Sequence, residues 1–274
     1  MSYANITDDA QMGNTELNQT FEYIDLIRRK INAARKEPEF SERLSERAQR
    51  TPASLQSDRD VLRIFARLIA YSQNAKATLV SGMLSKGIFE TAFCNFEVEQ
   101  VRMMKPAAVE AMYWDAISAI RFKRKIRAII SSAESLSSIQ AKYGSFIELL
   151  ERTDIPPILR SAADVERFWQ GFDNLLLVLK KEKMPFFKCT TSLLHFLLSV
   201  GYDCIKPDII VMRVAKKGNM VPSETGDENR RKVVKDIQFY SIDRQIRPSV
   251  VDLYFLIYGG QTGVTHLVHP WFYA

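Results

Sequence analysis

Apolar residues recur at helical spacing along nearly the whole chain. The clearest case follows Ser57, where residues three and four positions apart are apolar and arginines fill other positions. The apolar residues are Val61, Leu62, Phe65, Leu68 and Ile69. Residues at this spacing share one face of an α-helix, so the pattern predicts an amphipathic helix. Ser57 with Asp60 three residues later resembles a capping box and predicts the helix start.

The same reasoning predicts helices along most of the remaining chain, separated by turns at prolines and glycines. Further helices are expected at about 107–119, 123–138, 163–181 (as one or two helices), 193–200, after Asp208, and within 218–235 behind a loop. Residues 250–258 suit a strand or a helix, because Pro248 before them fits the first turn of a helix. No other segment shows a convincing alternation of period two, so the fold class expected is all-α.

Length and composition fit one large or two small globular domains. The chain has 274 residues, of which 46% are hydrophobic. Residues 1–20 are polar and are expected to form an N-terminal arm, with a helical domain over 21–274. No secretory signal is visible, and the apolar stretch 189–202 is too short to span a bilayer. We therefore expect a cytoplasmic protein with no membrane contact.

Cysteine content and net charge exclude only a few functional classes. The three cysteines, Cys94, Cys189 and Cys204, are far apart, which argues against a disulfide framework or a four-cysteine metal site. We expect no metal and no cofactor. The net charge of +6 permits a polyanionic partner without requiring one.

Four segments stand out against this helical background. They are a helix end at 68–75, a basic turn at 120–126, a break between two helices at 184–191, and a helix start at 206–214. Their order and spacing resemble the helix-hairpin-helix DNA glycosylase superfamily over about the middle half of the chain. The front half most resembles the bacterial 3-methyladenine glycosylase branch, whereas the last segment is more similar to the endonuclease III branch.

The resemblance implies a two-lobed helical glycosylase fold with a helix-hairpin-helix DNA-binding element at about 173–200. It also implies a catalytic segment at about 205–215, with the catalytic aspartate at Asp208. Breaking a glycosidic bond develops positive charge on the sugar, and a fixed carboxylate stabilises that charge and orients water. The alternative is that Asp208, following Pro207, only caps a helix.

Three residues near the first segment are candidates for the base pocket. In similar enzymes a glutamine at the position of Gln73 fills the gap left by the extruded base. Asn74 lies beside it, and Tyr71 is an aromatic candidate for stacking on the flipped base. The alternative for Gln73 is a polar residue at a fraying helix end, and for Tyr71 a place in the core.

The basic turn predicts contacts with DNA phosphates. Five of the seven residues 121–127 are basic, and the candidates are Arg121, Lys123, Arg124 and Lys125. Phosphates supply most non-specific affinity, so a cationic turn suits this role. The alternative is an ordinary solvated face.

The third segment occupies the place of the hairpin, with Lys188, Thr190 and Thr191 as phosphate-binding candidates. Backbone N–H groups at a helix start hold phosphate in such hairpins. The sequence departs from the usual pattern, because Phe186 and Lys188 stand where glycines are common. Thr190 stands near the position where bifunctional members carry a catalytic lysine, which implies a monofunctional enzyme.

The expected function is therefore base flipping followed by hydrolysis to an abasic site, on double-stranded DNA, by a monomer. The resemblance favours an alkylated purine as substrate. Two alternatives stay open: a glycosylase for a hypermodified, phage-type base in defence, and a non-catalytic helix-hairpin-helix protein that only binds DNA. The zinc-binding residues of the 3-methyladenine branch have no counterpart in this sequence.

Overall fold

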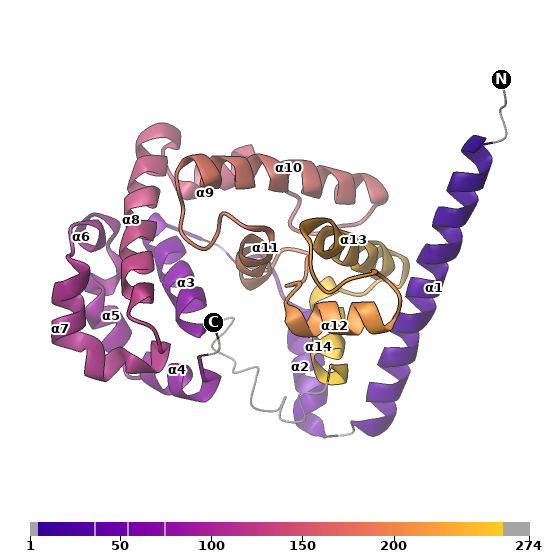
Figure 1. Ribbon diagram of the computed structural model, residues 1–274, viewed down its shortest axis with the longest axis horizontal. Coiled ribbons are helices and arrows are strands. Elements are labelled where there is room, and N and C mark those ends of the chain that lie inside the picture. Colours follow the sequence, from indigo (N-terminus) through magenta and orange to yellow (C-terminus); the bar gives the residue numbers. More distant parts are fainter. Residues whose placement is uncertain (1–4, 36, 54, 74, 260–274) are drawn as a thin grey trace. The chain divides into compact units, whose positions relative to one another are not determined.

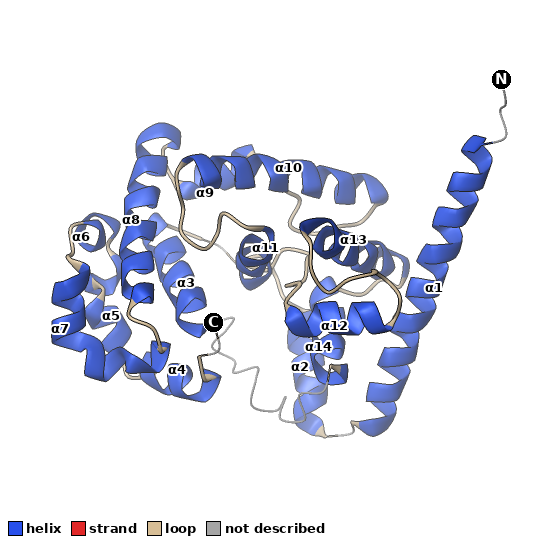
Figure 2. Cartoon of the chain, viewed as in Figure 1, coloured by secondary structure: helices blue, strands red, loops and turns tan. Residues whose placement is uncertain are grey.

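The computed structural model describes residues 5–35, 37–53, 55–73 and 75–259, with side chains from Thr15 onward. These residues form fourteen α-helices, two short 3-10 helices and no strand (Figures 1 and 2), which confirms the all-α prediction. The helices are α1 (Asn5–Ala34), α2 (Pro38–Ala48), α3 (Asp58–Tyr71), α4 (Ala77–Leu84), α5 (Ile88–Ala92), η1 (Cys94–Phe96), α6 (Val98–Arg102), α7 (Pro106–Ile117), η2 (Ser118–Ile120), α8 (Arg124–Tyr143), α9 (Phe146–Arg152), α10 (Ala162–Lys181), α11 (Thr190–Ser199), α12 (Ile209–Lys217), α13 (Asp227–Asp243) and α14 (Pro248–Tyr258). No helix among the described residues is both long enough and apolar enough to cross a bilayer.

The helices divide into two compact units. Within the described residues, unit 1 consists of 5–51, Ile158–Val165 and 203–259, and so contains α1, α2, α12, α13 and α14. Within the described residues, unit 2 consists of Pro52–Pro157 and Glu166–Tyr202, and so contains α3 to α9, most of α10, and α11.

Helix boundaries follow the local sequence signals. The Ser57 side chain accepts a hydrogen bond from the Asp60 backbone N–H, so the cap predicted for α3 is confirmed. Gly201 follows α11 with a φ of 91°, a conformation that favours glycine. Pro248 occupies the first turn of α14, which settles residues 250–258 as helix. At the N-terminus α1 begins at Asn5, so the described part of the expected polar arm is helical.

Unit 2 is built around a cluster of phenylalanines. Phe65 of α3 stacks on Phe187 with ring centroids 4.0 Å apart, and it meets Phe146 and Phe196 edge-on. All four side chains are almost completely buried. Helix α3 also packs along α8, so its carboxyl end lies against the start of α8. The cluster therefore fixes the helix that ends at the candidate base pocket.

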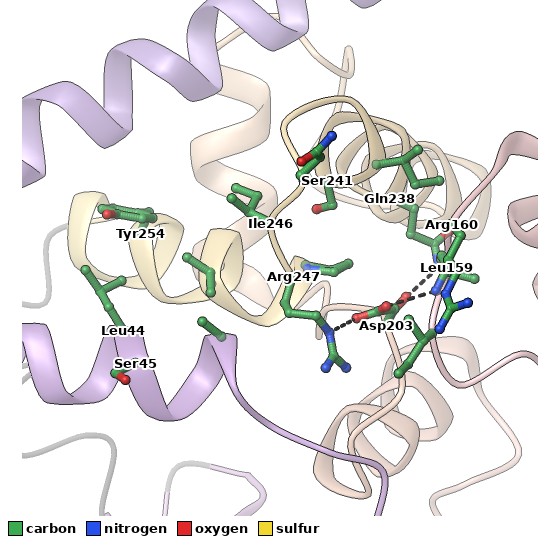
Figure 3. A pocket seen from close by; sticks show the side chains of 16 residues that line it. Leu44, Ser45, Leu159, Arg160, Asp203, Gln238, Ser241, Ile246, Arg247 and Tyr254 are labelled. Carbon is green, nitrogen blue, oxygen red and sulfur yellow. Dashed lines mark hydrogen bonds and ion pairs between the residues drawn. The ribbon is translucent and has the colours of Figure 1, made fainter.

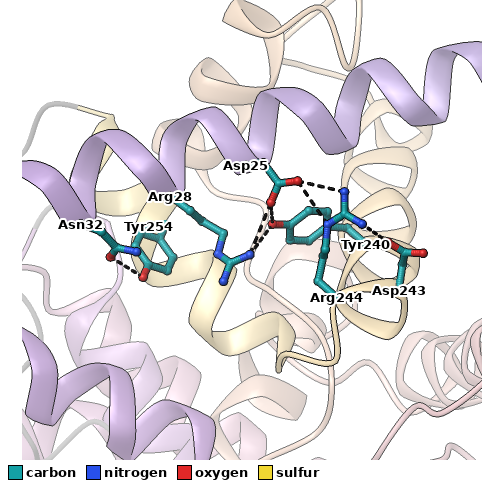
Figure 4. Close-up of polar contacts among 7 residues, drawn as sticks. All are labelled: Asp25, Arg28, Asn32, Tyr240, Asp243, Arg244 and Tyr254. Carbon is teal, nitrogen blue, oxygen red and sulfur yellow. Dashed lines mark hydrogen bonds and ion pairs between the residues drawn. The ribbon is translucent and has the colours of Figure 1, made fainter.

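Unit 1 holds α1 through a polar network with α13 and α14 (Figure 4). The Tyr240 hydroxyl donates to Asp25 Oδ1 at 2.6 Å and accepts from Arg28 Nη1 at 2.8 Å. Arg244 Nη2 donates to Asp25 Oδ2 at 2.9 Å. Burial opposes ionisation of Asp25, but the hydrogen bonds from Tyr240 and Arg244 outweigh it and lower the pKa of that carboxyl. The fully buried Tyr240 therefore links two charged groups on α1 to α13.

We predict that Tyr240→Phe lowers the free energy of unfolding by about 1–3 kcal/mol, because it removes hydrogen bonds between a buried hydroxyl and charged groups. Urea denaturation at neutral pH measures the loss. Tyr143→Phe is the matched control, because the half-buried Tyr143 of unit 2 belongs to no such network. Equal stability of Tyr240→Phe and wild type would show that the network contributes nothing to folding.

Candidate functional site

Asp208 caps α12, and its carboxylate is partly exposed. Its Oδ1 accepts hydrogen bonds from the backbone N–H groups of Ile210 at 3.0 Å and Val211 at 3.2 Å. The side chain is 25% exposed, and its Oδ2 lies 3.8 Å from Lys206 Nζ. These two N–H donors at the positive end of the helix fix the orientation of the carboxylate. The capping interpretation is thus correct, and it leaves a fixed anion within reach of solvent.

The other two carboxylates of this region are buried in ion pairs. Asp203 is 2% exposed, accepts from the Leu159 N–H at 2.9 Å and is paired with Arg247. Asp252 is 3% exposed and accepts from Arg47 Nη1 at 2.8 Å. Burial raises the pKa of both carboxyls, although their partners oppose the shift. These contacts indicate structural roles for both residues.

A cavity of about 670 Å³ lies within unit 1, between α2, residues 158–160, α13 and α14 (Figure 3). Among the described residues that line it, Asp203 is the only carboxylate, and Figure 3 shows this side chain engaged with Arg247 and Leu159. Asp208 is not among the lining residues. The cavity is therefore separate from the candidate catalytic group.

In unit 2 the structure joins the first two sequence segments. Gln73 lies two residues after the end of α3, is exposed and has a φ of 54°. Its Oε1 accepts hydrogen bonds from Arg124 Nη2 at 3.0 Å and Arg124 Nε at 3.3 Å. The candidate stack-filling residue thus contacts the basic turn, 51 positions away in the sequence. Asn74 lies outside the described residues.

Tyr71 occupies the last turn of α3 and is half-buried. Its hydroxyl shares a 2.7 Å hydrogen bond with Ser81 Oγ of α4. Burial raises the pKa of Tyr71, so the phenol stays protonated at neutral pH. The hydrogen bond limits how far the ring can move, and the side chain stays partly exposed.

Three basic residues of the turn before α8 are exposed. The guanidinium groups of Arg121 and Arg124 lie over the half-buried Phe122 ring, at 5.0 and 4.8 Å from its centroid. Lys123 forms an ion pair with Glu110 and lies 5.3 Å from the Trp114 ring. Aromatic side chains therefore hold these cations at the surface, where a phosphate group has access to them.

Lys125 differs from these neighbours because it is completely buried. Its Nζ donates to the backbone carbonyl of Ala70 at 2.9 Å and to that of Ser72 at 2.6 Å. A buried ammonium bound to two carbonyls is not placed to bind a phosphate, unlike what the run of basic residues suggested. The missed signal is periodicity, since Lys125 lies four residues before the buried Ile129 on the same helix face.

The expected hairpin region consists of α10, the connecting residues 182–189 and α11. Phe186 has a φ of 61°, so the backbone keeps the left-handed conformation that a glycine favours at this position. The adjacent Phe187 is buried and anchors the connection against Phe65. The connection therefore keeps one glycine-like turn without a glycine.

The phosphate-binding candidates of this connection have different environments. Lys188 is exposed, Thr191 is half-buried, and Thr190 is 4% exposed in the first turn of α11. Cys189 is the N-cap residue, but its side chain does not cap a backbone N–H group. The first N–H groups of α11 thus have no side-chain cap from Cys189, and the exposed Lys188 lies just before them in the sequence.

The site residues fall into two groups. Tyr71, Gln73, Arg121, Lys123 and Arg124 come together in unit 2, whereas Asp208 belongs to unit 1. Among the described residues, no group of three or more His, Cys, Asp or Glu side chains is placed to hold a metal ion.

The all-α fold, the basic turn beside Gln73 and the oriented carboxylate of Asp208 fit the class of DNA glycosylases. The family model of the methyladenine glycosylases matches residues 53–191, a little over half of the chain. The chain belongs to the methyladenine glycosylase family, within the helix-hairpin-helix superfamily, and is a DNA glycosylase that acts on alkylated bases. No curated protein and no solved structure matches the chain.

The matched residues include the Gln73 turn, the basic turn and the start of α11. They end before Asp208, so the family match does not bear on this residue. The evidence for a catalytic role of Asp208 is its geometry and exposure.

We predict that Asp252→Asn and Asp208→Asn affect stability very differently. Asp252→Asn leaves Arg47 as an uncompensated buried charge, which costs about 3–5 kcal/mol. Asp208→Asn keeps a good N-cap residue, so its effect is expected to be below about 1 kcal/mol. Urea denaturation of both variants measures the difference. A large loss for Asp208→Asn would indicate that this carboxylate is mainly structural.

Proposed function

We propose that this protein is a monofunctional DNA glycosylase that extrudes an alkylated purine from double-stranded DNA and hydrolyses its N-glycosidic bond. One observation carries the catalytic assignment. Of Asp203, Asp208 and Asp252, only Asp208 has a partly exposed carboxylate, and two backbone N–H groups hold it in place. We further propose that both units belong to one glycosylase that acts as a monomer in the cytoplasm.

The proposed reaction uses Asp208 as an electrostatic and water-orienting group. As the bond between the sugar and the purine nitrogen breaks, its electron pair leaves with the base and positive charge develops on the sugar. The Asp208 carboxylate stabilises this charge and orients a water molecule. The water oxygen forms the new bond to the sugar carbon, and the proton that the water loses passes to the carboxylate and from there to solvent. A base alkylated at a ring nitrogen is cationic before cleavage and leaves as a neutral molecule.

The monofunctional assignment rests on Thr190, which supplies a buried hydroxyl near the position where bifunctional members have a lysine. Without an amine there, no imine forms with the sugar. The product is an abasic site in an intact strand, and alkali is needed to cleave that strand.

We propose that Arg121, Lys123 and Arg124 bind the DNA backbone through their exposed cations. Lys188 and the N–H groups at the start of α11, with Thr190 and Thr191, form a second phosphate contact in the hairpin. Its support is the helix start without a side-chain cap and the exposed Lys188.

We propose that Gln73 fills the space left by the extruded base and that Tyr71 lines the base pocket. Filling the stack offsets part of the unstacking cost, which is a few kcal/mol. The exposed position of Gln73 beside the basic turn supports this role.

We predict that Asp208→Asn reduces single-turnover base release by orders of magnitude while duplex affinity persists. An amide keeps the cap but supplies no anion in the transition state. Methylated DNA is incubated with each protein, and the released bases are identified by mass spectrometry. Duplex affinity is measured by filter binding. Asp203→Asn is unsuitable as a control because that residue is in a buried pair, so Asp115→Asn, on the exposed surface of α7, is used. Wild-type release by Asp208→Asn would overturn the catalytic assignment.

We predict that changing Arg121, Lys123 and Arg124 to glutamine weakens binding to all duplex sequences alike. Each lost phosphate contact reduces the slope of log affinity against log salt by about 0.9. Affinity is measured across a salt series by fluorescence anisotropy. The triple change Lys86→Gln, Arg102→Gln and Lys105→Gln removes equal charge from exposed positions of unit 2 that lie outside the basic turn and the hairpin. Equal slopes for both triple variants would exclude the basic turn from the interface.

A further inference from the structure

The buried ammonium of Lys125 is an unusual feature of unit 2. In the described part of the chain no carboxylate lies within ion-pair distance of its Nζ. Its hydrogen-bond partners are the carbonyls of Ala70 and Ser72, and it lies 5.9 Å from the centroid of the Phe122 ring. Burial, together with the neighbouring charges of Arg124 and Arg121, lowers the pKa of Lys125 to about 8. Burying such a charge is costly, whereas an apolar side chain at this position is not.

The two carbonyls lie at the carboxyl end of α3, where the helix leaves such groups without intrahelical partners. This end also carries the negative pole of the helix dipole, which offsets part of the cost of burying the charge. The ammonium therefore connects the start of α8 to Ala70 and Ser72, the residues on either side of Tyr71, and Ser72 immediately precedes Gln73.

The backbone at Gln73 needs such support. Its φ of 54° lies in the left-handed region, which is unfavourable for residues other than glycine and persists where surrounding contacts enforce it. Lys125 binds the preceding carbonyl, and Arg124 binds the side chain of Gln73. Two consecutive residues of α8 thus fix both the backbone and the side chain of this turn.

We infer that Lys125 is a positioning residue for base extrusion. It holds the end of α3 so that Gln73 projects at a set place relative to the phosphate-binding cations of the same basic turn. Because Arg121 and Arg124 bind the DNA backbone, this connection fixes the position of Gln73 relative to the strand being opened. The inference rests on the proposed role of Gln73 in filling the stack.

If Lys125 only filled the core, a different result would be expected for its replacement. In that case methionine, of similar length and without the charge, supports activity equally on every substrate. A positioning residue is needed only where Gln73 is needed, which is in extruding a base from a paired duplex. A target that is already unpaired does not require this step.

The experiment compares Lys125→Met, Gln73→Ala and the double variant with wild type. Single-turnover excision is measured at saturating DNA for a methylated purine opposite its normal partner and for the same purine in an unpaired bulge. Lys86→Met is the matched control, because Lys86 is exposed in unit 2 and lies outside the basic turn. Melting curves first establish that each variant folds, and Lys125→Gln replaces Lys125→Met if the latter does not.

We expect Lys125→Met to slow excision from the paired duplex about tenfold or more, because the offset to an unstacking cost of a few kcal/mol is lost. Excision from the bulge is expected to change less than threefold. The double variant should be no slower than the slower single variant, because both changes remove the same interaction.

Three results would overturn the inference: wild-type rates for Lys125→Met on both substrates, equal losses on both, or losses that multiply in the double variant. Failure of the proposed function gives a different result, because wild-type protein then releases no base from either substrate. Failure of the Gln73 role alone appears as equal losses on both substrates for Gln73→Ala.

Discussion

The carboxyl end of α3 leaves carbonyl groups that the helix itself does not satisfy, and the arrangement of the site in unit 2 depends on how they are satisfied. Lys125 takes two of them from within the core. Ser57 caps the other end of the same helix, and the phenylalanine cluster holds its middle. Because α3 is fixed at both ends, Tyr71 and Gln73 emerge at a defined place. The basic turn is positioned by the same contact, since Lys125 and Arg124 are consecutive.

A helix end also explains why capping and catalysis are compatible at Asp208. The sequence presented them as alternatives, and the structure shows the cap directly. A carboxylate that accepts hydrogen bonds from two backbone N–H groups is held in one orientation, which suits a group that stabilises positive charge. One oxygen makes the cap and the other lies on the side of Lys206. Capping α12 therefore orients the same carboxylate that we propose to act in catalysis.

Most of the fold was predictable because its signals are local. Apolar periodicity predicted α3, α7, α8 and α11, and the Ser57 and Asp60 pair predicted a cap that the structure contains. The contacts of the site were harder to predict from the sequence, because they join residues that are distant in it. Nothing local indicates that Arg124 meets Gln73, and a lysine within a basic run is normally exposed. The burial of Lys125 could have been predicted from its position on the buried face of α8, but its charge suggested an exposed residue.

The connection between α10 and α11 shows how a backbone conformation can survive the loss of its usual residue. Phe186 adopts a φ of 61°, at a cost of about 1 kcal/mol for a residue with a Cβ atom. The next residue, Phe187, stacks on Phe65 and is almost fully buried, which stabilises by more than that cost. Packing of Phe187 against Phe65 thus compensates for the absence of a glycine at the left-handed position. Because Phe65 lies on α3, the same helix that presents Gln73 also holds the segment leading to the start of α11.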